Sequence, residues 1–202
     1  MIPGTQGYAE HAAELSKRFE SVSFAKKHAA IMHLLPSAPS TVLDLGAGTG
    51  ADAAWFASRG HSVVAVEPTD ALRHAGIELH GVGAFEWVDD SLPDLARSRA
   101  CVERFDVVML TAVWMHLDER ERRKAMPRLA SLLAPNGVLV MSIRHGPAPS
   151  ERRIFEVTDE ETVALASQCS LKKLLALRTE SVQMANRLAG VTWSRLAFQP
   201  LG

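Results

Sequence analysis

The chain has 202 residues, of which 47% are hydrophobic, enough for one globular domain with a continuous apolar core. A formal charge of −1 and a pI near 6.7 provide no field that would concentrate nucleic acid. Two isolated cysteines, Cys101 and Cys169, exclude a disulfide framework, and the lack of a secretion signal and of a run of roughly 20 apolar residues predicts a cytoplasmic protein without a membrane span.

The first 35 residues are predicted to be helical. Four residues at spacings of four, three and four would share one helix face: Phe24, His28, Ile31 and Leu35. Pro36 and Pro39 then end the helix, because proline lacks the N–H group that a helix needs.

Five aliphatic and β-branched runs predict strands that alternate with helical segments. The strands are expected at residues 41–45, 62–66, 84–88, 105–110 and 138–143. The helices are expected at 51–58, at 69–79, after 93, and after Asp118, where Glu121 completes a capping-box pattern. Pro127 predicts a kink or break in the last helix, and residues 134–137 predict a turn. Parallel neighbours need crossover connections, so this alternation predicts a doubly wound parallel sheet.

The end of the chain departs from this alternation. Residues 171–179 and 191–199 both predict strands, separated by a loop that holds Asn186 and Gly190. We expect them to pair as an antiparallel hairpin. The whole chain, 1–202, is thus predicted to form one α/β domain.

A glycine-rich loop follows the first predicted strand. Gly46, Gly48 and Gly50 allow a sharp turn and let a ligand approach the backbone without interference from a Cβ atom. With Ala51 the loop also satisfies a variant of the dinucleotide-binding fingerprint, so the loop does not choose between nucleoside cofactors.

Two acids stand beside this loop in the predicted sheet. Asp44 lies two residues before the first glycine, and Glu67 ends the second strand. A carboxylate at the tip of the second strand can accept hydrogen bonds from both hydroxyls of a ribose. The pattern therefore predicts a nucleoside cofactor at the carboxyl edge of the sheet.

Several segments in order resemble the class I S-adenosylmethionine-dependent methyltransferases, over roughly residues 40 to 145. The matching segments are Val42-Leu43-Asp44-Leu45-Gly46-Ala47-Gly48-Thr49-Gly50, Val64-Ala65-Val66-Glu67-Pro68, Asp89-Asp90-Ser91-Leu92-Pro93, Phe105-Asp106-Val107-Val108, Thr111 to Leu117, and Leu133-Ala134-Pro135-Asn136-Gly137-Val138-Leu139. In the last segment Asn136 replaces the family's first glycine. The resemblance implies a seven-stranded sheet that a C-terminal antiparallel hairpin completes, and S-adenosyl-L-methionine as cofactor.

The resemblance also implies roles for individual residues. Gly46 and Gly48 would pack under the methionine and ribose, Glu67 would bind the ribose hydroxyls, and Asp90, with Asp89 as the alternative, would face the adenine amino group. The family's usual adenine acid would fall at Val88, so the loop must be shorter or its register shifted. The complete expected cofactor set is Tyr8, Asp44, Gly46, Ala47, Gly48, Gly50, Glu67, Pro68, Asp89, Asp90, Ser91 and Thr111.

Methyl transfer from a sulfonium needs mainly proximity and orientation, with a base only where the acceptor carries a proton. Candidate catalytic residues follow the fourth and fifth strands: His116, His145 and Arg144, with Trp114 nearby. Arg144 could instead clamp an acidic substrate group, and His116 could simply pack under the next helix.

Residues 1–36 are expected to form a lid over the cofactor and acceptor, where Tyr8 could contact the methionine carboxylate. A small-molecule acceptor is expected, since no basic docking surface is visible; the mixed charges of 118–124 fit a solvated helix face. The alternatives are an NAD(P)-binding oxidoreductase and a non-catalytic S-adenosylmethionine-binding module. Neither the acceptor nor the oligomeric state follows from the sequence.

Overall fold

A computed structural model describes residues 4–96, 104–148 and 150–202. Its strands are β1 (Thr41–Leu45), β2 (Ser62–Val66), β3 (Glu86–Val88), β4 (Phe105–Thr111), β5 (Leu133–His145), β6 (Leu171–Glu180) and β7 (Thr192–Pro200). Its α-helices are α1 (Ala12–Glu20), α2 (Phe24–Lys27), α3 (Ala51–Ala57), α4 (Asp70–His80), α5 (Glu119–Ser131), α6 (Asp159–Gln168) and α7 (Met184–Leu188). Two 3₁₀ helices are η1 (Ala29–Leu34) and η3 (Trp114–His116).

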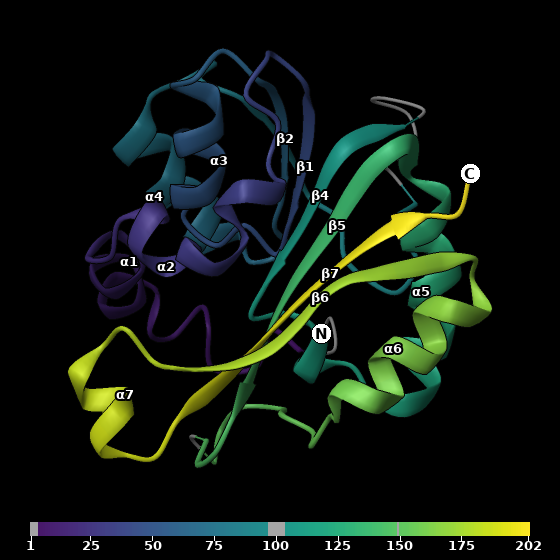
Figure 1. Cartoon of the computed structure of the whole chain (residues 1–202). Helices are drawn as coiled ribbons and strands as arrows, with labels where there is room; N and C mark the ends of the chain where they lie inside the picture. Colours follow the sequence, from purple (N-terminus) through teal and green to yellow (C-terminus); the bar gives the residue numbers. More distant parts are fainter. Residues whose placement is uncertain (1–3, 97–103, 149) are drawn as a thin grey trace.

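The strands form one seven-stranded sheet in the order β3-β2-β1-β4-β5-β7-β6 (Figure 1). The first five strands in this order are parallel, and β7 runs antiparallel to both β5 and β6. The predicted α/β fold class and the C-terminal antiparallel hairpin are confirmed. The loop expected within the hairpin is instead the helix α7.

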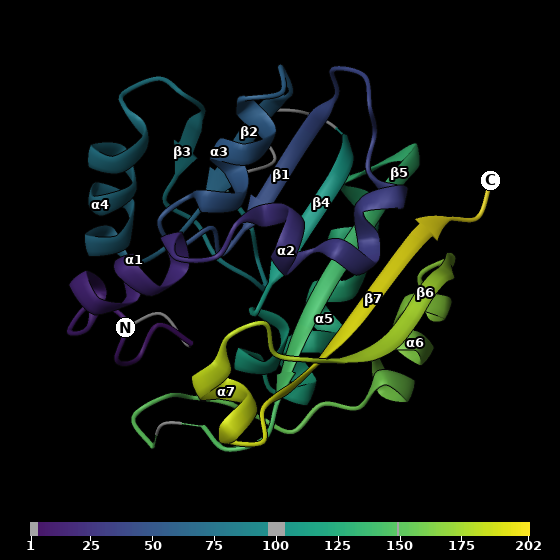
Figure 2. The same ribbon diagram turned by 60° about the vertical axis from the view of Figure 1, so that its left-hand side comes forward.

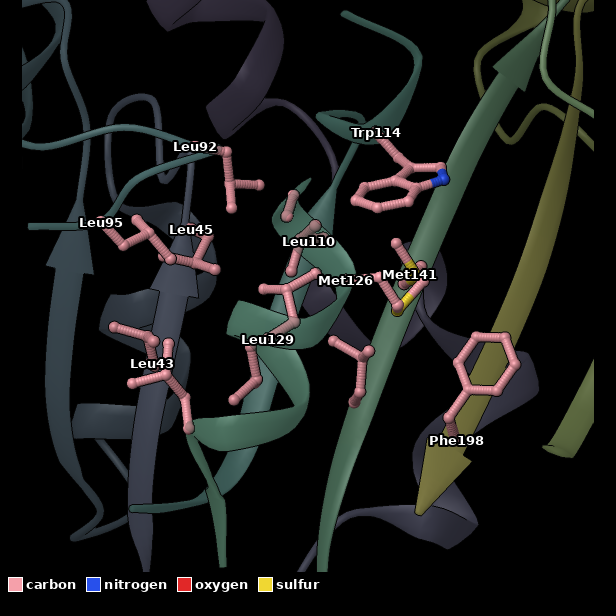
Figure 3. Close-up of a cluster of buried hydrophobic side chains, with 14 of the residues drawn as sticks. Leu43, Leu45, Leu92, Leu95, Leu110, Trp114, Met126, Leu129, Met141 and Phe198 are labelled. Atoms are coloured by element: carbon pink, nitrogen blue, oxygen red, sulfur yellow. The ribbon is translucent and has the colours of Figure 1, made fainter. Parts of the chain in front are cut away.

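Helices cover both faces of the sheet (Figure 2). On one face, Val42 and Val140 pack with Phe24 of α2 and with Ala53 and Phe56 of α3. On the other face, α5 and α6 cover a larger apolar cluster. Figure 3 shows strand residues of this cluster, Leu43, Leu45, Leu110, Met141 and Phe198, together with Met126 and Leu129 of α5. Successive side chains of a strand point to opposite faces of the sheet, so the strands contribute apolar side chains to both clusters.

The prediction of one continuous helix over residues 1–35 is wrong. The chain forms α1, α2 and η1 instead, with Ser21 and Ser23 between the first two. These breaks turn the chain so that Phe24 stacks on Trp55, with ring centroids 3.8 Å apart, and His28 reaches Asp52. The predicted apolar face still holds at Phe24, His28 and Ile31, which are buried.

The carboxyl-terminal half differs from expectation in two further places. Helix α5 runs through Pro127 without a break; the proline lies on the exposed side of the helix. The capping box is present, since Asp118 accepts from Glu121 N and Glu121 accepts from Asp118 N, both at 2.8 Å. Residues 134–137, which were expected to form a turn, lie within β5, where its register against β4 shifts.

The segment after Pro93 forms turns rather than a helix as far as residue 96. Cys101 and the rest of the helix expected there lie outside the described residues. Cys169 packs partly buried against the apolar cluster beneath α5 and α6. In the ranges that the structure covers, no helix has the length and apolar character to cross a membrane.

Candidate functional site

A cavity of about 360 Å³ lies at the carboxyl ends of β1, β2, β4 and β5. Most of the sequence-predicted site residues line it: Tyr8, Asp44, Gly46, Ala47, Gly48, Glu67, Pro68, Asp90, Ser91, Thr111, His116 and Arg144. Parallel strands bring their carboxyl ends to one edge, which explains how residues more than a hundred positions apart meet here.

The glycine loop turns directly off the end of β1. Gly46 N and Ala47 N donate to Val66 O at 2.8 and 3.0 Å, so the loop is tied to the end of β2. Gly46 and Gly48 have φ values of 67° and 59°, in the left-handed region that glycine favours. A Cβ atom on Gly46 would overlap Val113 Cγ2. The loop therefore requires glycine for its own packing, and it leaves its backbone open to the cavity.

Glu67 is buried and joins this loop to the start of α4. Its Oε2 accepts from Gly48 N at 2.9 Å, and its Oε1 accepts from Thr69 N at 2.8 Å. Burial raises the pKa of Glu67, while the two backbone donors oppose that rise. The Thr69 side chain also hydrogen-bonds to Glu67. A carboxylate has about four acceptor positions, so these three donors do not fill it.

Asp44 is 1% exposed and lines the same cavity. Its Oδ2 has no hydrogen-bond partner. Burial, and next the charge of Asp52, raise the pKa of Asp44 well above its ordinary value. A buried carboxylate oxygen without a donor is costly, so this position fits a ligand that brings a cation or an N–H donor.

Asp52 is a buried acid that the sequence reasoning missed. It pairs with Lys27 Nζ at 2.7 Å and with His28 Nε2 at 2.9 Å, and Thr111 Oγ1 donates to it at 2.9 Å. Burial opposes ionisation of Asp52, but the charges of His28 and Lys27 outweigh that effect and lower its pKa. The only sequence signal was the burial of His28 on an apolar face.

His116 and Tyr8 line the cavity together and contact each other. His116 Nδ1 is 2.7 Å from Arg153 O, which can only accept, so Nδ1 carries the proton. Burial lowers the pKa of His116 and favours the neutral ring, whose Nε2 accepts from the Tyr8 hydroxyl at 2.9 Å. The hydroxyl of Tyr8 is thus coupled to an unprotonated nitrogen.

Besides the buried Arg195 of β7, three arginines line the cavity with this pair. Arg144, at the end of β5, was predicted, whereas Arg18 of α1 and Arg152 of the following loop were not. The Arg152 guanidinium lies 4.6 Å from the centre of the Tyr8 ring. No periodicity marks the two missed arginines, because each reaches the site from a distant segment.

Gly50, Asp89, His145 and Trp114 lie outside the cavity lining. Gly50 begins α3, and a Cβ atom there would come within 2.8 Å of Phe85. Asp89 is half-exposed and lies 3.4 Å from Arg73, so placement at the cavity favours Asp90 over Asp89. His145 is turned toward Ser194, at 2.7 Å. Trp114 is in the core (Figure 3), and its Nε1 donates to Thr162 Oγ1 at 3.2 Å.

Comparison with known proteins agrees with this geometry. An uncharacterized methyltransferase of Mycobacterium tuberculosis (strain ATCC 25618 / H37Rv) is 35% identical over 117 residues, which cover 54% of this chain. The match spans 42% of that relative, less than half of its length.

Two solved structures share the fold. The 1,6-didemethyltoxoflavin-N1-methyltransferase of Burkholderia thailandensis, solved with 1,6-didemethyltoxoflavin and S-adenosylhomocysteine, has a TM-score of 0.74 and 21% identity, covering 96% of this chain and 86% of its own. The N-methyltransferase NodS of Bradyrhizobium japonicum, solved with S-adenosylhomocysteine, has a TM-score of 0.67 and 16% identity, covering 95% and 100%.

The family of methyltransferase domains matches residues 12–177, which hold the glycine loop, both acids beside it, strands β1 to β5 and most of β6. With the seven-stranded fold and the cavity at its carboxyl edge, this match is decisive: the chain belongs to the methyltransferase domain family.

Proposed function

We propose that the chain binds S-adenosyl-L-methionine in this cavity and transfers its methyl group to a small molecule. The observation that carries the proposal is the meeting of three features in one cavity: the open glycine backbone, the fixed Glu67 carboxylate and the unpartnered Asp44 oxygen. When bound, the cofactor supplies an electrophilic methyl group on a sulfonium. The family match supports the same reaction type.

The residues present fit this cofactor. Glu67 would accept from the ribose hydroxyls with the acceptor capacity that Gly48 and Thr69 leave free. Asp44 would take the cofactor's amino group, whose N–H donors and positive charge satisfy the buried oxygen. Asp90 and Ser91 would line the adenine side, where Leu92 also faces the cavity.

His116 and Tyr8 are proposed to remove a proton when the acceptor carries one. The acceptor's proton would pass to Tyr8 Oη while the hydroxyl proton of Tyr8 moves to His116 Nε2, which is 2.9 Å away. The carbonyl of Arg153 holds the ring in the required tautomer. His145 has no part in this proposal, because it lies outside the cavity.

A small-molecule acceptor is supported by the near-zero net charge of the chain, which does not favour a polyanionic macromolecule. One short segment, 181–186, lines the cavity beside α1, and Gln183 Nε2 donates to Arg18 O at 3.5 Å.

The test is calorimetric titration of the purified chain with S-adenosylhomocysteine and, separately, with NAD. We expect S-adenosylhomocysteine to bind and to raise the melting temperature, and NAD to do neither. Binding of NAD alone would overturn the proposal in favour of an oxidoreductase. Binding of S-adenosylhomocysteine without transfer of a labelled methyl group to a broad panel of small acceptors would instead indicate a binding module.

A further inference from the structure

The cavity wall carries an accumulation of positive charge. Arg18 comes from α1, Arg144 from the end of β5, and Arg152 from the loop that leads toward α6. Their pKa values reflect this closeness: burial first, and then the charge of Arg152, lower the pKa of both Arg18 and Arg144. With the buried Arg195 of β7, four separate segments thus bring four guanidinium groups to one cavity.

These guanidinium groups lack the carboxylate partners that other arginines of the chain have. Arg122 pairs with Glu161 at 2.8 Å, and Arg153 pairs with Glu121 at 2.7 Å. Within residues 4–96, 104–148 and 150–202, no carboxylate oxygen lies at ion-pair distance from Arg18, Arg144 or Arg152. Glu14, one turn from Arg18 on α1, is the acid whose charge acts on Arg18.

Arg18 is exposed to solvent, whereas Arg144 and Arg152 are only partly exposed. Arg152 Nε is buried and has no hydrogen-bond partner, although Arg152 lies against the Tyr8 ring. Arg144 uses one nitrogen on Gly146 O, at 3.2 Å. Like charges held together at a cavity are costly unless an anion completes the arrangement.

The proposed cofactor supplies at most part of that anion. It brings one carboxylate together with two positive groups, the sulfonium and the ammonium. One guanidinium can pair with that carboxylate, and two remain without a partner. An anionic group on another ligand in the same cavity would complete the arrangement.

We propose, resting on the proposed methyl transfer, that the methyl acceptor is an anionic small molecule whose carboxylate or phosphate group is bound by Arg144 and Arg152. The planar fork of each guanidinium suits bidentate binding of either group. Because Arg152 lies over the Tyr8 ring, an anion held there places the acceptor beside the hydroxyl that His116 contacts. Arg18 remains for the cofactor carboxylate.

The test is calorimetry of the chain saturated with S-adenosylhomocysteine, so that the cofactor carboxylate is already in place. The probes are benzoate and inorganic phosphate, with benzamide as the neutral match for benzoate. We expect at least one anion to bind about 10-fold more tightly than benzamide, and Arg144→Gln and Arg152→Gln to weaken that anion about 10-fold each. Arg123→Gln, an exposed arginine on α5, controls for lost net charge.

Each outcome decides the question. Failure of S-adenosylhomocysteine itself to bind would reject the proposed function, and the acceptor inference with it. Cofactor binding with no preference for either anion over benzamide would overturn the acceptor inference alone. So would a loss of S-adenosylhomocysteine affinity in both variants with unchanged anion affinity, since the two arginines would then serve the cofactor. Arg152→Lys, which keeps the charge but not the fork, provides a second variant if Arg152→Gln fails to fold.

Discussion

Three carboxylates are buried around one cavity, and their surroundings give each a different task. Glu67 is held by two backbone donors, Asp52 by a lysine and a histidine, and Asp44 Oδ2 by no partner in the described structure. A buried carboxylate is stable only to the extent that donors or cations compensate it. The number of donors and cations around each carboxylate therefore distinguishes Asp44, which we propose binds the ligand, from Asp52, which stabilises the fold.

Replacing Glu67 tests the ribose contact. We expect Glu67→Ala to weaken S-adenosylhomocysteine binding at least several-fold, since a hydrogen bond to a charged group contributes about 1.5–3 kcal/mol. Calorimetry measures the effect, with the exposed neighbour Asp70→Ala as control. An unchanged affinity would remove Glu67 from the cofactor site. Far-UV circular dichroism checks that the lost contacts to Gly48 N and Thr69 N do not unfold the variant.

The lowered pKa of Asp52 predicts how the stability of the fold changes in acid. Its pKa lies below the ordinary value of 3.8 in the folded chain, so its ionised form stabilises the fold above that pH and loses this effect as the pH falls. We expect Asp52→Asn to cost about 3 kcal/mol near neutral pH, with relief of repulsion toward Asp44 reducing the cost. Urea unfolding should show the deficit shrinking below pH 3.8. A deficit independent of pH would show that the charge of Asp52 is not the cause.

At the scale of elements, the junction between β1 and α3 combines backbone conformation with packing. Gly46 needs its positive φ and also the absence of a side chain, because Val113 occupies the adjoining space. Gly60, which follows α3, also has a positive φ of 84°, but no atom lies within 4 Å of a Cβ built there. Alanine at Gly60 would therefore introduce conformational strain alone, whereas alanine at Gly46 would introduce both strain and steric overlap.

We expect Gly60→Ala to cost about 1–2 kcal/mol of unfolding free energy, the strain of a left-handed alanine. Gly46→Ala should cost a further 1–3 kcal/mol or so, because it also overpacks the junction. Urea unfolding measures both variants. Val113→Ala in the Gly46→Ala background should recover part of the loss, and equal costs for the two alanine variants would show that the overlap relaxes freely.

At the scale of the whole molecule, two segments distant in sequence close the cavity. Residues 4–22 supply Tyr8, Arg18 and Phe19, and residues 181–186 reach them from the connection between β6 and β7 (Figure 2). Gln183 links the two segments through Arg18 O. Residues 1–36 were predicted to act as a lid over the ligand. Hydrogen exchange can test whether residues 4–22, together with 181–186, cover it.

We expect S-adenosylhomocysteine to slow amide hydrogen exchange in residues 4–22 and 181–186, because a ligand beneath them adds contacts that local opening must break. Exchange in α6, on the far side of β5, serves as the internal control and should not change. Mass spectrometry of peptides measures both regions. Protection confined to the glycine loop would show that the two segments do not cover the ligand.

Much of this protein follows from its sequence alone. Strands β1 and β2 lie at the predicted residues, since buried β-branched runs have few other stable arrangements. The capping box at Asp118 and the glycine loop also follow, because their determinants lie within a few residues of one another. These local signals were enough to predict the fold class and the edge of the sheet that holds the cavity.

Only the tertiary structure decided how the amino-terminal residues divide into three short helices, and which side chains meet across the cavity. His28 meets Asp52, and Arg18 and Arg152 meet Tyr8, through the packing of distant segments on the sheet. No local propensity encodes such meetings, because the free energy that fixes them comes from burial and charge between residues far apart in the chain.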